Sequence, residues 1–265
     1  MSINSYLTEL ASELVLRDSE KESIDRSIAT IHSRLKLYFS DVEEDFRFGS
    51  HTRGTILPRK ADENSDIDYM VVFNNQNNYK PQTYLNRLRA FAEYYYSRSD
   101  IKQSHPTIVL ELNHIKFELV PAYHEKILGY DLGYKIPGLG TGYEEWISTN
   151  PNDFNQELIR INTNNGSKIK PVIRLVKYWN ARNNHVYSSY FLEKHIMGIS
   201  FILCTSINDY FQTVVDNLPE YSVGLSTAKV EKVRKLKKDI KEIYEYEEKY
   251  PTYALSELQK ILPRL

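Results

Sequence analysis

The sequence predicts an α+β protein in which a mixed α/β half precedes a helical half. Residues 66–73, 107–112 and 115–122 are rich in β-branched and aromatic side chains, which is typical of strands. Beyond residue 151, apolar residues recur at helical spacing almost to the end of the chain. With 265 residues, 41% of them hydrophobic, the chain is long enough to bury a substantial core.

The first half opens with a long amphipathic helix, because Ile24, Ile28, Ile31 and Leu35 follow one another at steps of four, three and four. Asn113-His114 is a two-residue turn between two strand-like runs, which predicts a hairpin. The elements expected in this half are a helix over 19–40, a strand in DFRFGS at 45–50, a polar loop over 51–65, a strand over 66–73, a helix over 81–99 and strands over 107–112 and 115–122.

The stretch from 123 to 150 contains several glycines, and we expect a long loop and the domain junction there. The sequence therefore suggests a catalytic lobe with N-terminal helices over 1–150 and a helical lobe over 151–265. The helices expected in the second lobe cover 152–163, 169–183, 188–209, 229–248 and 254–262. In the lysine-rich run 229–249 the apolar residues keep helical spacing, so we interpret it as a helix packed on the core rather than an RNA-binding segment.

Composition excludes several classes of protein. Lys and Arg number 34 against 35 Asp and Glu, which argues against a mainly electrostatic nucleic-acid binder, and we expect no stable DNA or RNA partner. Cys204 is the only cysteine, which excludes a disulfide framework and a zinc site of several thiolates. The N-terminus lacks a basic start followed by an apolar run, and no stretch has the length of a membrane span. We expect a cytoplasmic protein with no membrane partner.

Two aspartates open the strand at 66–73. Asp66 and Asp68 lie two residues apart, so their carboxylates point to the same face, where they repel each other unless cations neutralise them. Alone, such a pair is also typical of a solvated strand end. Glu118 lies on a later strand, and if the two strands are neighbours, three carboxylates converge on a site for two Mg²⁺ or Mn²⁺ ions.

Gly49 and Ser50 strengthen the functional interpretation of the aspartates. A Gly-Ser pair where a strand ends and a helix begins presents backbone N–H groups and a hydroxyl to an anion, and phosphate is the expected ligand. The residue types and their order therefore agree with transfer of a nucleotide.

These motifs resemble the polymerase-β-like nucleotidyltransferase superfamily, whose signature is hydrophobic-Gly-Ser, a spacer, Asp-hydrophobic-Asp and a later third carboxylate. The matching segments are FGSHTRGTILPRKADENSDIDYMVVF and IKFELVPAY. Within it, the chain is similar to the branch of 2′-5′ oligoadenylate synthetases, cyclic GMP-AMP synthase and the bacterial cGAS/DncV-like nucleotidyltransferases, including paired helices in PVIRLVKYWNARNNHVYSSYFLEKHI. The resemblance implies a mixed sheet with flanking helices, a helical lobe and an active site in the cleft between them.

The resemblance also implies roles for individual residues. Gly49 and Ser50 would hold nucleotide phosphates, while Asp66, Asp68 and Glu118 would bind the two metal ions. Glu118 is a departure, because many relatives have Asp there.

In the paired helices, Lys177 would neutralise the β and γ phosphates, Ser188 and Ser189 would contact them, and Tyr190 would stack on a base. Each has an alternative interpretation. Lys177 is also typical of a lysine beside a buried helix face whose ammonium group reaches solvent. Either serine is also a typical N-cap, with Glu193 close to the capping-box position, and Tyr190 is as typical of a core residue.

Arg53 and Thr55 follow the Gly-Ser pair closely enough to contact a phosphate or the incoming substrate, although arginines are also common in loops. His51 is interpreted as incidental, since the histidines show no metal-ligand spacing.

The favoured function is joining nucleoside triphosphates into a cyclic or short linear oligonucleotide second messenger, with release of pyrophosphate. The family likeness implies anti-phage defence and a downstream effector that responds to the product. Alternatives are an RNA nucleotidyltransferase of the CCA-adding or poly(A) type, a protein-modifying nucleotidyltransferase toxin and a catalytically inactive regulator. An isoelectric point near 6.7 argues against the RNA enzyme, and retention of all three carboxylates argues against the inactive regulator.

Overall fold

The computed structural model describes residues 1–104, 106–127, 130–138, 145–221 and 225–265. The chain divides into two compact units that interleave along the sequence, whereas the sequence suggested a single boundary near residue 150. The sheet unit comprises Arg17–Arg53 and Asn64–Glu157. The helical unit comprises Met1–Leu16, Gly54–Glu63 and Leu158–Leu265.

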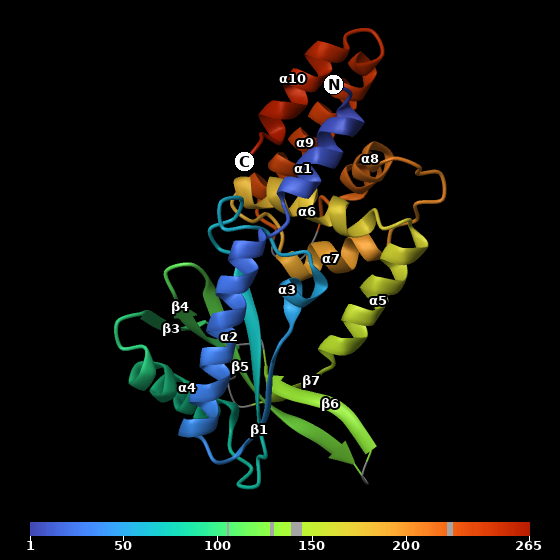
Figure 1. Cartoon of the computed structure of the whole chain (residues 1–265). Helices are drawn as coiled ribbons and strands as arrows, with labels where there is room; N and C mark the ends of the chain where they lie inside the picture. The colour runs from blue at the N-terminus through green and yellow to red at the C-terminus, as the bar shows by residue number, and fades with distance from the viewer. Residues whose placement is uncertain (105, 128–129, 139–144, 222–224) are drawn as a thin grey trace. The chain divides into compact units, whose positions relative to one another are not determined.

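A seven-stranded mixed sheet forms the centre of the sheet unit (Figure 1). Its strands are β1 (Val42–Arg47), β2 (Asp66–Phe73), β3 (Asp100–Ser104), β4 (Thr107–Glu111), β5 (Lys116–Ile127), β6 (Tyr130–Pro137) and β7 (Trp146–Thr149). They are ordered β1-β2-β5-β4-β3, with β6 pairing β5 and β7. Only the β2–β5 pair is parallel among the described pairings. The predicted mixed α+β fold is thus confirmed.

Strands β6 and β7 occupy the region that the sequence predicted as a long loop, so that prediction was wrong for the described residues. Strand β5 continues beyond its partner β4, and its second half pairs with β6, as in Tyr123 opposite Lys135. Strand β6 in turn pairs with β7, with Pro137 opposite Trp146. Pairing along a neighbouring strand overrides the local turn preference of these residues. The predicted hairpin at Asn113-His114 is confirmed by the antiparallel pairing of β4 and β5.

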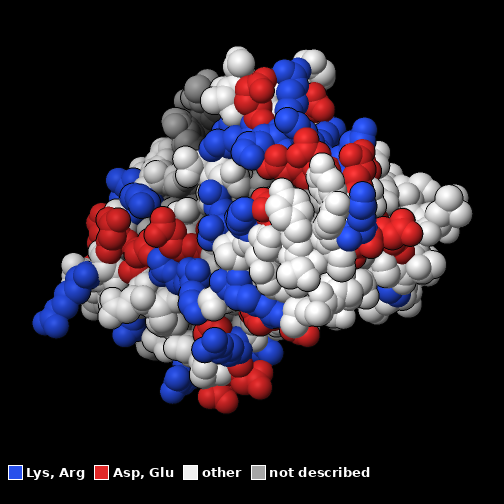
Figure 2. Space-filling model, turned by 90° about the horizontal axis from the view of Figure 1, so that it is seen from above, with Lys and Arg blue, Asp and Glu red and all other residues white. Residues whose placement is uncertain are grey.

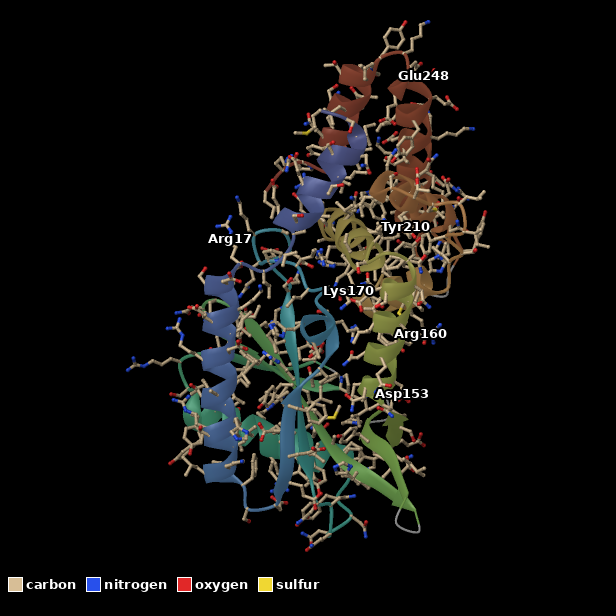
Figure 3. All side chains as sticks on the ribbon, turned by 45° about the vertical axis from the view of Figure 1, so that its right-hand side comes forward. Arg17, Asp153, Arg160, Lys170, Tyr210 and Glu248 are labelled. Atoms are coloured by element: carbon tan, nitrogen blue, oxygen red, sulfur yellow. The ribbon has the colours of Figure 1, made fainter. Side chains whose placement is uncertain are left out.

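The sheet unit also contains α2 (Asp18–Tyr38), the five-residue α3 (Gly49–Arg53) and α4 (Pro81–Tyr95). Helix α2 begins after Arg17, which Figure 3 labels. The backbone N–H of Arg17 donates to Glu20 Oε2 at 2.9 Å. Helix α4 starts with Pro81, which suits the first turn because its missing N–H has no partner there. Leu85, Leu88 and Phe91 of α4 are fully buried.

The helical unit contains α1 (Ile3–Glu13), α6 (Ile169–Arg182), α7 (Ser189–Met197), α8 (Ile207–Asn217), α9 (Thr227–Glu247) and α10 (Pro251–Ile261), and α5 (Pro151–Asn164) enters it at Leu158. Figure 3 labels Lys170 near the start of α6 and Tyr210 on α8. One apolar cluster joins these helices, including Leu7 of α1, Val176 of α6 and Leu258 of α10. Helix α1 belongs to this unit because its apolar face is buried in that cluster.

The predicted helix over 188–209 is two helices, so this prediction was wrong in its extent. Helix α7 ends at Met197 with Gly198 as its C-cap, and α8 begins after Ser206. Ser206 and Asp209 form a capping box in which each side chain accepts from the other residue's backbone N–H. Such reciprocal caps start a new helix even where apolar spacing continues. No helix among the described residues is long and apolar enough to cross a membrane.

Candidate active site

The predicted carboxylates lie on two neighbouring parallel strands. Asp66 and Asp68 are on β2 and Glu118 is on β5, with Asp68 directly opposite Glu118 in the register. Side chains at paired positions of adjacent strands point to the same face. The pairing that the sequence analysis required as a condition is therefore present.

Gly49 brings the start of α3 against Asp68. Its φ is +72°, in the left-handed region, and an added Cβ would lie 1.7 Å from Asp68 Oδ2. Only a glycine fits such a close approach. The backbone N–H of Phe48 also donates to the Asp68 carbonyl oxygen at 3.0 Å, so the Gly-Ser motif and the aspartate pair form one local structure. Ser50 is buried beside it, with 9% of its surface exposed.

Glu118 is electrostatically perturbed. Burial, followed by the nearby Asp66 carboxylate, raises its pKa to about 7. Lys116 acts in the opposite direction but does not cancel these effects. A raised carboxyl pKa means that negative charge is under-compensated here, which is the condition that a bound cation relieves.

A divalent metal suits these residues chemically, although the described part of the structure contains no group of three or more His, Cys, Asp or Glu side chains arranged to hold a metal ion. Carboxylate oxygens are the hard ligands that Mg²⁺ and Mn²⁺ prefer. The shared face of Asp68 and Glu118 and the raised pKa of Glu118 both agree with cation binding. Metal binding by the three residues stays a prediction.

Arg53 ends α3 and is largely buried in the sheet unit, with 8% of its surface exposed. Its guanidinium donates to Asn155 Oδ1 at 3.4 Å and lies 4.8 Å from the Phe154 ring centre. These contacts fix its position, and a role at the substrate stays a prediction. His51 Nδ1 is buried and has no hydrogen-bond partner within the part of the chain that the structure describes, and burial lowers the pKa of this histidine.

In the helical unit, Lys177 does not reach solvent as a surface lysine would. It is 5% exposed, and its ammonium donates to Glu193 Oε1 at 3.3 Å. The same oxygen accepts from the hydroxyl of Thr55 at 2.7 Å. Glu193 and Thr55 are both fully buried. The structure therefore brings Lys177 and Thr55 together around a carboxylate that the sequence analysis considered only as a helix cap.

The serines lie at the start of α7. Ser188 is the N-cap, and its Oγ accepts from the backbone N–H of Phe191 at 3.2 Å. Ser189 is the first residue of the helix and is half-buried. Tyr190 is 56% exposed, so the core alternative does not hold for it. Capping and anion binding are compatible at this position, and the nucleotide contacts stay predictions.

Asn180 stabilises the turn between α6 and α7 by two hydrogen bonds. Its Nδ2 donates to the Tyr187 carbonyl oxygen at 2.9 Å, and its Oδ1 accepts from the Tyr187 backbone N–H at 3.0 Å. Asn180 is 1% exposed. Asn180 was not predicted from the sequence, although a polar residue inside an otherwise apolar helix face was an available signal, and Glu193 was predicted only as a helix cap.

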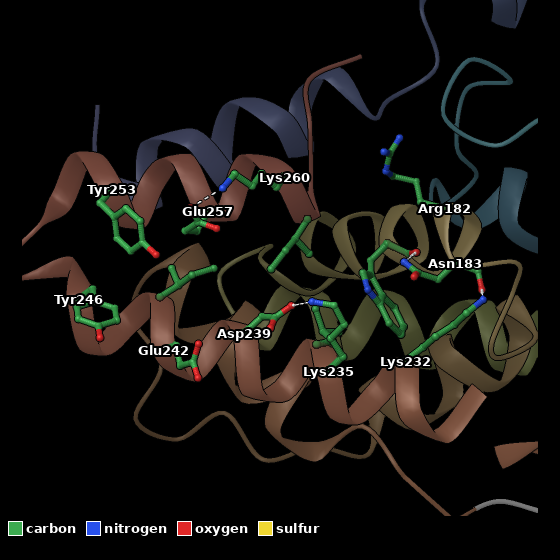
Figure 4. A pocket seen from close by; sticks show the side chains of 14 residues that line it. Arg182, Asn183, Lys232, Lys235, Asp239, Glu242, Tyr246, Tyr253, Glu257 and Lys260 are labelled. Carbon is green, nitrogen blue, oxygen red and sulfur yellow. Dashed lines mark hydrogen bonds and ion pairs between the residues drawn. The ribbon is translucent and has the colours of Figure 1, made fainter. Parts of the chain in front are cut away.

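A separate cavity of about 410 Å³ lies among α6, α9 and α10 (Figure 4). Acidic, basic and aromatic side chains line it together, including Arg182, Glu242 and Tyr253. None of the predicted site residues lines it.

Helix α9 packs its Val233, Leu236, Ile240 and Ile243 inward, which confirms the prediction of a packed helix. On the face drawn in Figure 2, basic and acidic side chains lie interspersed.

Comparison with known proteins relates this arrangement to a family. Residues 1–162 match the Second Messenger Oligonucleotide or Dinucleotide Synthetase domain. A curated cyclic AMP-AMP-AMP synthase of Acinetobacter sp. (strain ATCC 27244 / 9458) is 25% identical over 191 residues, which are 69% of this chain and 53% of the relative. The chain thus spans about half the length of that relative.

Solved structures share the fold. The Vibrio cholerae DncV cyclic AMP-GMP synthase superposes with a TM-score of 0.74 at 13% identity, covering 95% of this chain and 92% of that one. CdnC of E. coli MS115-1, solved in complex with HORMA-deltaN, gives a TM-score of 0.70 at 14% identity, covering 97% and 96% of the two chains. At these identities the likeness establishes the fold alone.

Proposed function

Since the chain belongs to the Second Messenger Oligonucleotide or Dinucleotide Synthetase family, we propose that it joins nucleoside triphosphates into a cyclic or short linear oligonucleotide. The 3′ or 2′ hydroxyl oxygen of one nucleotide attacks the α-phosphorus of another. A phosphate ester bond forms, the bond between the α- and β-phosphates breaks, and pyrophosphate leaves. The proton of the attacking hydroxyl passes to solvent or to a nearby proton acceptor.

The observation that carries the proposal is the local structure at the end of β2. Asp68 lies opposite Glu118 across parallel strands, and Gly49 packs against the Asp68 carboxylate. The residues that would bind metal ions, Asp68 and Glu118, are thus held together by strand pairing, and Gly49, which would bind phosphate, is held beside them by its close approach to Asp68. Such fixed placement is what a reaction between two bound nucleotides requires.

Asp66, Asp68 and Glu118 would hold two Mg²⁺ or Mn²⁺ ions. When bound, these ions would neutralise phosphate charge and favour the ionised form of the attacking hydroxyl. Gly49 and Ser50 would contact phosphate at the start of α3. In the helical unit, Lys177, Ser188 and Ser189 would bind the triphosphate, and Tyr190 would stack on a base.

The biological setting follows the family. We place the protein in the cytoplasm, in anti-phage signalling, with an effector that responds to the product. The complex of CdnC with HORMA-deltaN supports a protein as a further partner.

The test is an incubation of the purified chain with all four nucleoside triphosphates and Mg²⁺ or Mn²⁺. Phosphatase then removes unprotected phosphates, and mass spectrometry identifies what survives. We expect pyrophosphate release and a phosphatase-resistant species of two or three nucleotides. Absence of both, with folded protein and with either metal, would contradict the proposal.

A further inference from the structure

We propose that Glu193 is a positioning residue that holds the Lys177 ammonium where it binds the triphosphate; this inference rests on the proposed function. The two residues lie on successive helices, Lys177 on α6 and Glu193 on α7. Their side chains meet at 3.3 Å in a buried part of the helical unit.

Stability alone gives a poor explanation for this pair. Glu193 is fully buried, as are Leu192 and Ile196 of the same helix. Bringing two charges out of water costs several kcal/mol per ion, and well-packed apolar residues at such positions are often equally stabilising or more so. A lysine and a glutamate facing each other here therefore point to a role in binding.

The geometry leaves Lys177 able to bind a second anion. An ammonium group has three N–H donors, and within the described residues Lys177 makes one hydrogen bond, to Glu193. Glu193 thereby fixes the direction of the side chain, while the other two N–H donors of the ammonium group point to no hydrogen-bond partner among the described residues and can bind phosphate oxygens.

Thr55 connects the pair to a second segment of the helical unit. Its hydroxyl donates to the same Oε1 atom at 2.7 Å, shorter than the Lys177 contact. The preceding residue, Gly54, accepts a hydrogen bond from Arg174 of α6 at 3.0 Å. Glu193 thus accepts a hydrogen bond from Thr55, and the segment that contains Thr55 is itself hydrogen-bonded to α6. These bonds fix the position of the carboxylate that orients Lys177.

The connection between the helices adds to this order. The two hydrogen bonds between Asn180 and Tyr187 fix the α6–α7 turn, immediately before the capping residue Ser188. Lys177 and the start of α7 are therefore parts of one preorganised element, with Glu193 at its buried centre.

A double-mutant cycle tests the proposal. The variants Glu193→Gln, Lys177→Met and the double variant are compared with wild type for KM and kcat in pyrophosphate release, and for ATP binding by calorimetry. We expect Glu193→Gln to raise KM and the ATP dissociation constant about tenfold, and Lys177→Met to raise them at least as much. The double variant should bind no worse than Lys177→Met alone, because Glu193 acts through Lys177.

Glu257→Gln is the matched control, since Glu257 of α10 pairs with Lys260 at 2.6 Å on the surface of the same unit. It should behave as wild type. If Glu193→Gln does not fold, the Thr55→Val variant tests the proposal instead. We expect its KM to rise two- to fivefold, whereas Thr55→Ser, which keeps the hydroxyl, should have the wild-type KM. The positioning role would be overturned by an unchanged KM in a folded Glu193→Gln variant. It would also be overturned if the effects of the two substitutions multiplied in the double variant. Where Glu193→Gln does not fold, an unchanged KM in Thr55→Val would overturn it.

The wild-type measurement separates the two proposals. Turnover by wild type without coupling between Glu193 and Lys177 overturns this inference and leaves the proposed function intact. A wild-type chain that neither releases pyrophosphate nor binds any of the four nucleoside triphosphates overturns both.

Discussion

The Cα atom of Gly49 faces the Asp68 carboxylate so closely that a methyl group added there would lie 1.7 Å from Oδ2. No real Cβ atom approaches an oxygen so closely, so a side chain at residue 49 must displace Asp68 or the start of α3. The glycine of the Gly-Ser motif therefore serves two purposes, the left-handed backbone and the space for the aspartate.

We predict that Gly49→Ala lowers kcat/KM at least ~100-fold, because displacement of a reacting group by about 1 Å has effects of this size. Gly54→Ala is the matched control. Gly54 has a nearly equal φ of +70°, but nothing lies within 4 Å of its added Cβ. Both variants should lose about 1 kcal/mol of stability from backbone strain. Gly49→Ala should lose more than Gly54→Ala because of its clash with Asp68, and only Gly49→Ala should lose activity. Equal kinetics in the two would contradict the role of the close approach.

The aspartates themselves give the second prediction. Asp68→Ala, or the double variant Asp66→Ala/Asp68→Ala, should reduce pyrophosphate release to background. The melting temperature without metal should stay unchanged or rise, because repulsion between carboxylates is relieved. Asp100→Asn, on exposed strand β3, is a control that should keep wild-type activity. Turnover near wild type in the double variant would end the metal-site hypothesis.

The third prediction concerns pH. The pKa of Glu118 is raised from 4.5 to about 7 in the folded chain, so between these values the folded state binds more protons than the unfolded state. The free energy of unfolding therefore falls as pH rises through this window. Without metal, the loss attributable to Glu118 is on the order of 3 kcal/mol by pH 8.

Glu118→Gln removes this titration. Denaturant unfolding at pH 5, 6, 7 and 8 should show a smaller decline in stability for Glu118→Gln than for wild type. Mg²⁺ should stabilise wild type more at pH 8 than at pH 5, because the carboxylate must lose its proton to bind a cation. Parallel pH profiles for the two proteins would argue that Glu118 titrates normally.

Strand β2 could be predicted to its ends from sequence because Asp66–Phe73 is rich in β-branched and aromatic residues. Strand β6 could not. Gly133 has a φ of +94°, and its added Cβ would lie 2.9 Å from the Thr149 carbonyl oxygen. Gly133, one of the glycines that suggested a loop there, is what lets β6 approach β7 closely.

The candidate site was predictable in its residue types but not in its contacts. The spacing of Asp66 and Asp68 put two carboxylates on one face, whereas the position of Glu118 depended on a parallel pairing between segments more than 40 residues apart. The burial of Lys177 against Glu193 had no sequence signal of its own, since both residues also fit a helix with a solvated side.

The last prediction tests the packing of α1 in the helical unit. Tyr6 is 1% exposed, and its hydroxyl donates to the Leu262 carbonyl oxygen at 2.6 Å, joining the first helix to the end of the chain. Arg264 pairs with Glu9 and Glu13 on the same helix. Tyr6→Phe removes one buried hydrogen bond and should cost about 1 kcal/mol, a fall of about 2–4 °C in melting temperature.

Tyr253→Phe serves as its control, because Tyr253 is 53% exposed and the same change there should alter stability by less than ~0.5 kcal/mol. Equal melting temperatures for the two variants would mean that the hydrogen bond from Tyr6 to Leu262 does not stabilise the helical unit. A selective loss in Tyr6→Phe would tie the first sixteen residues to the unit that contains Lys177 and Glu193, because the helix that Tyr6 anchors also supplies the Ala11 carbonyl oxygen that accepts from Arg174 Nε at 3.2 Å.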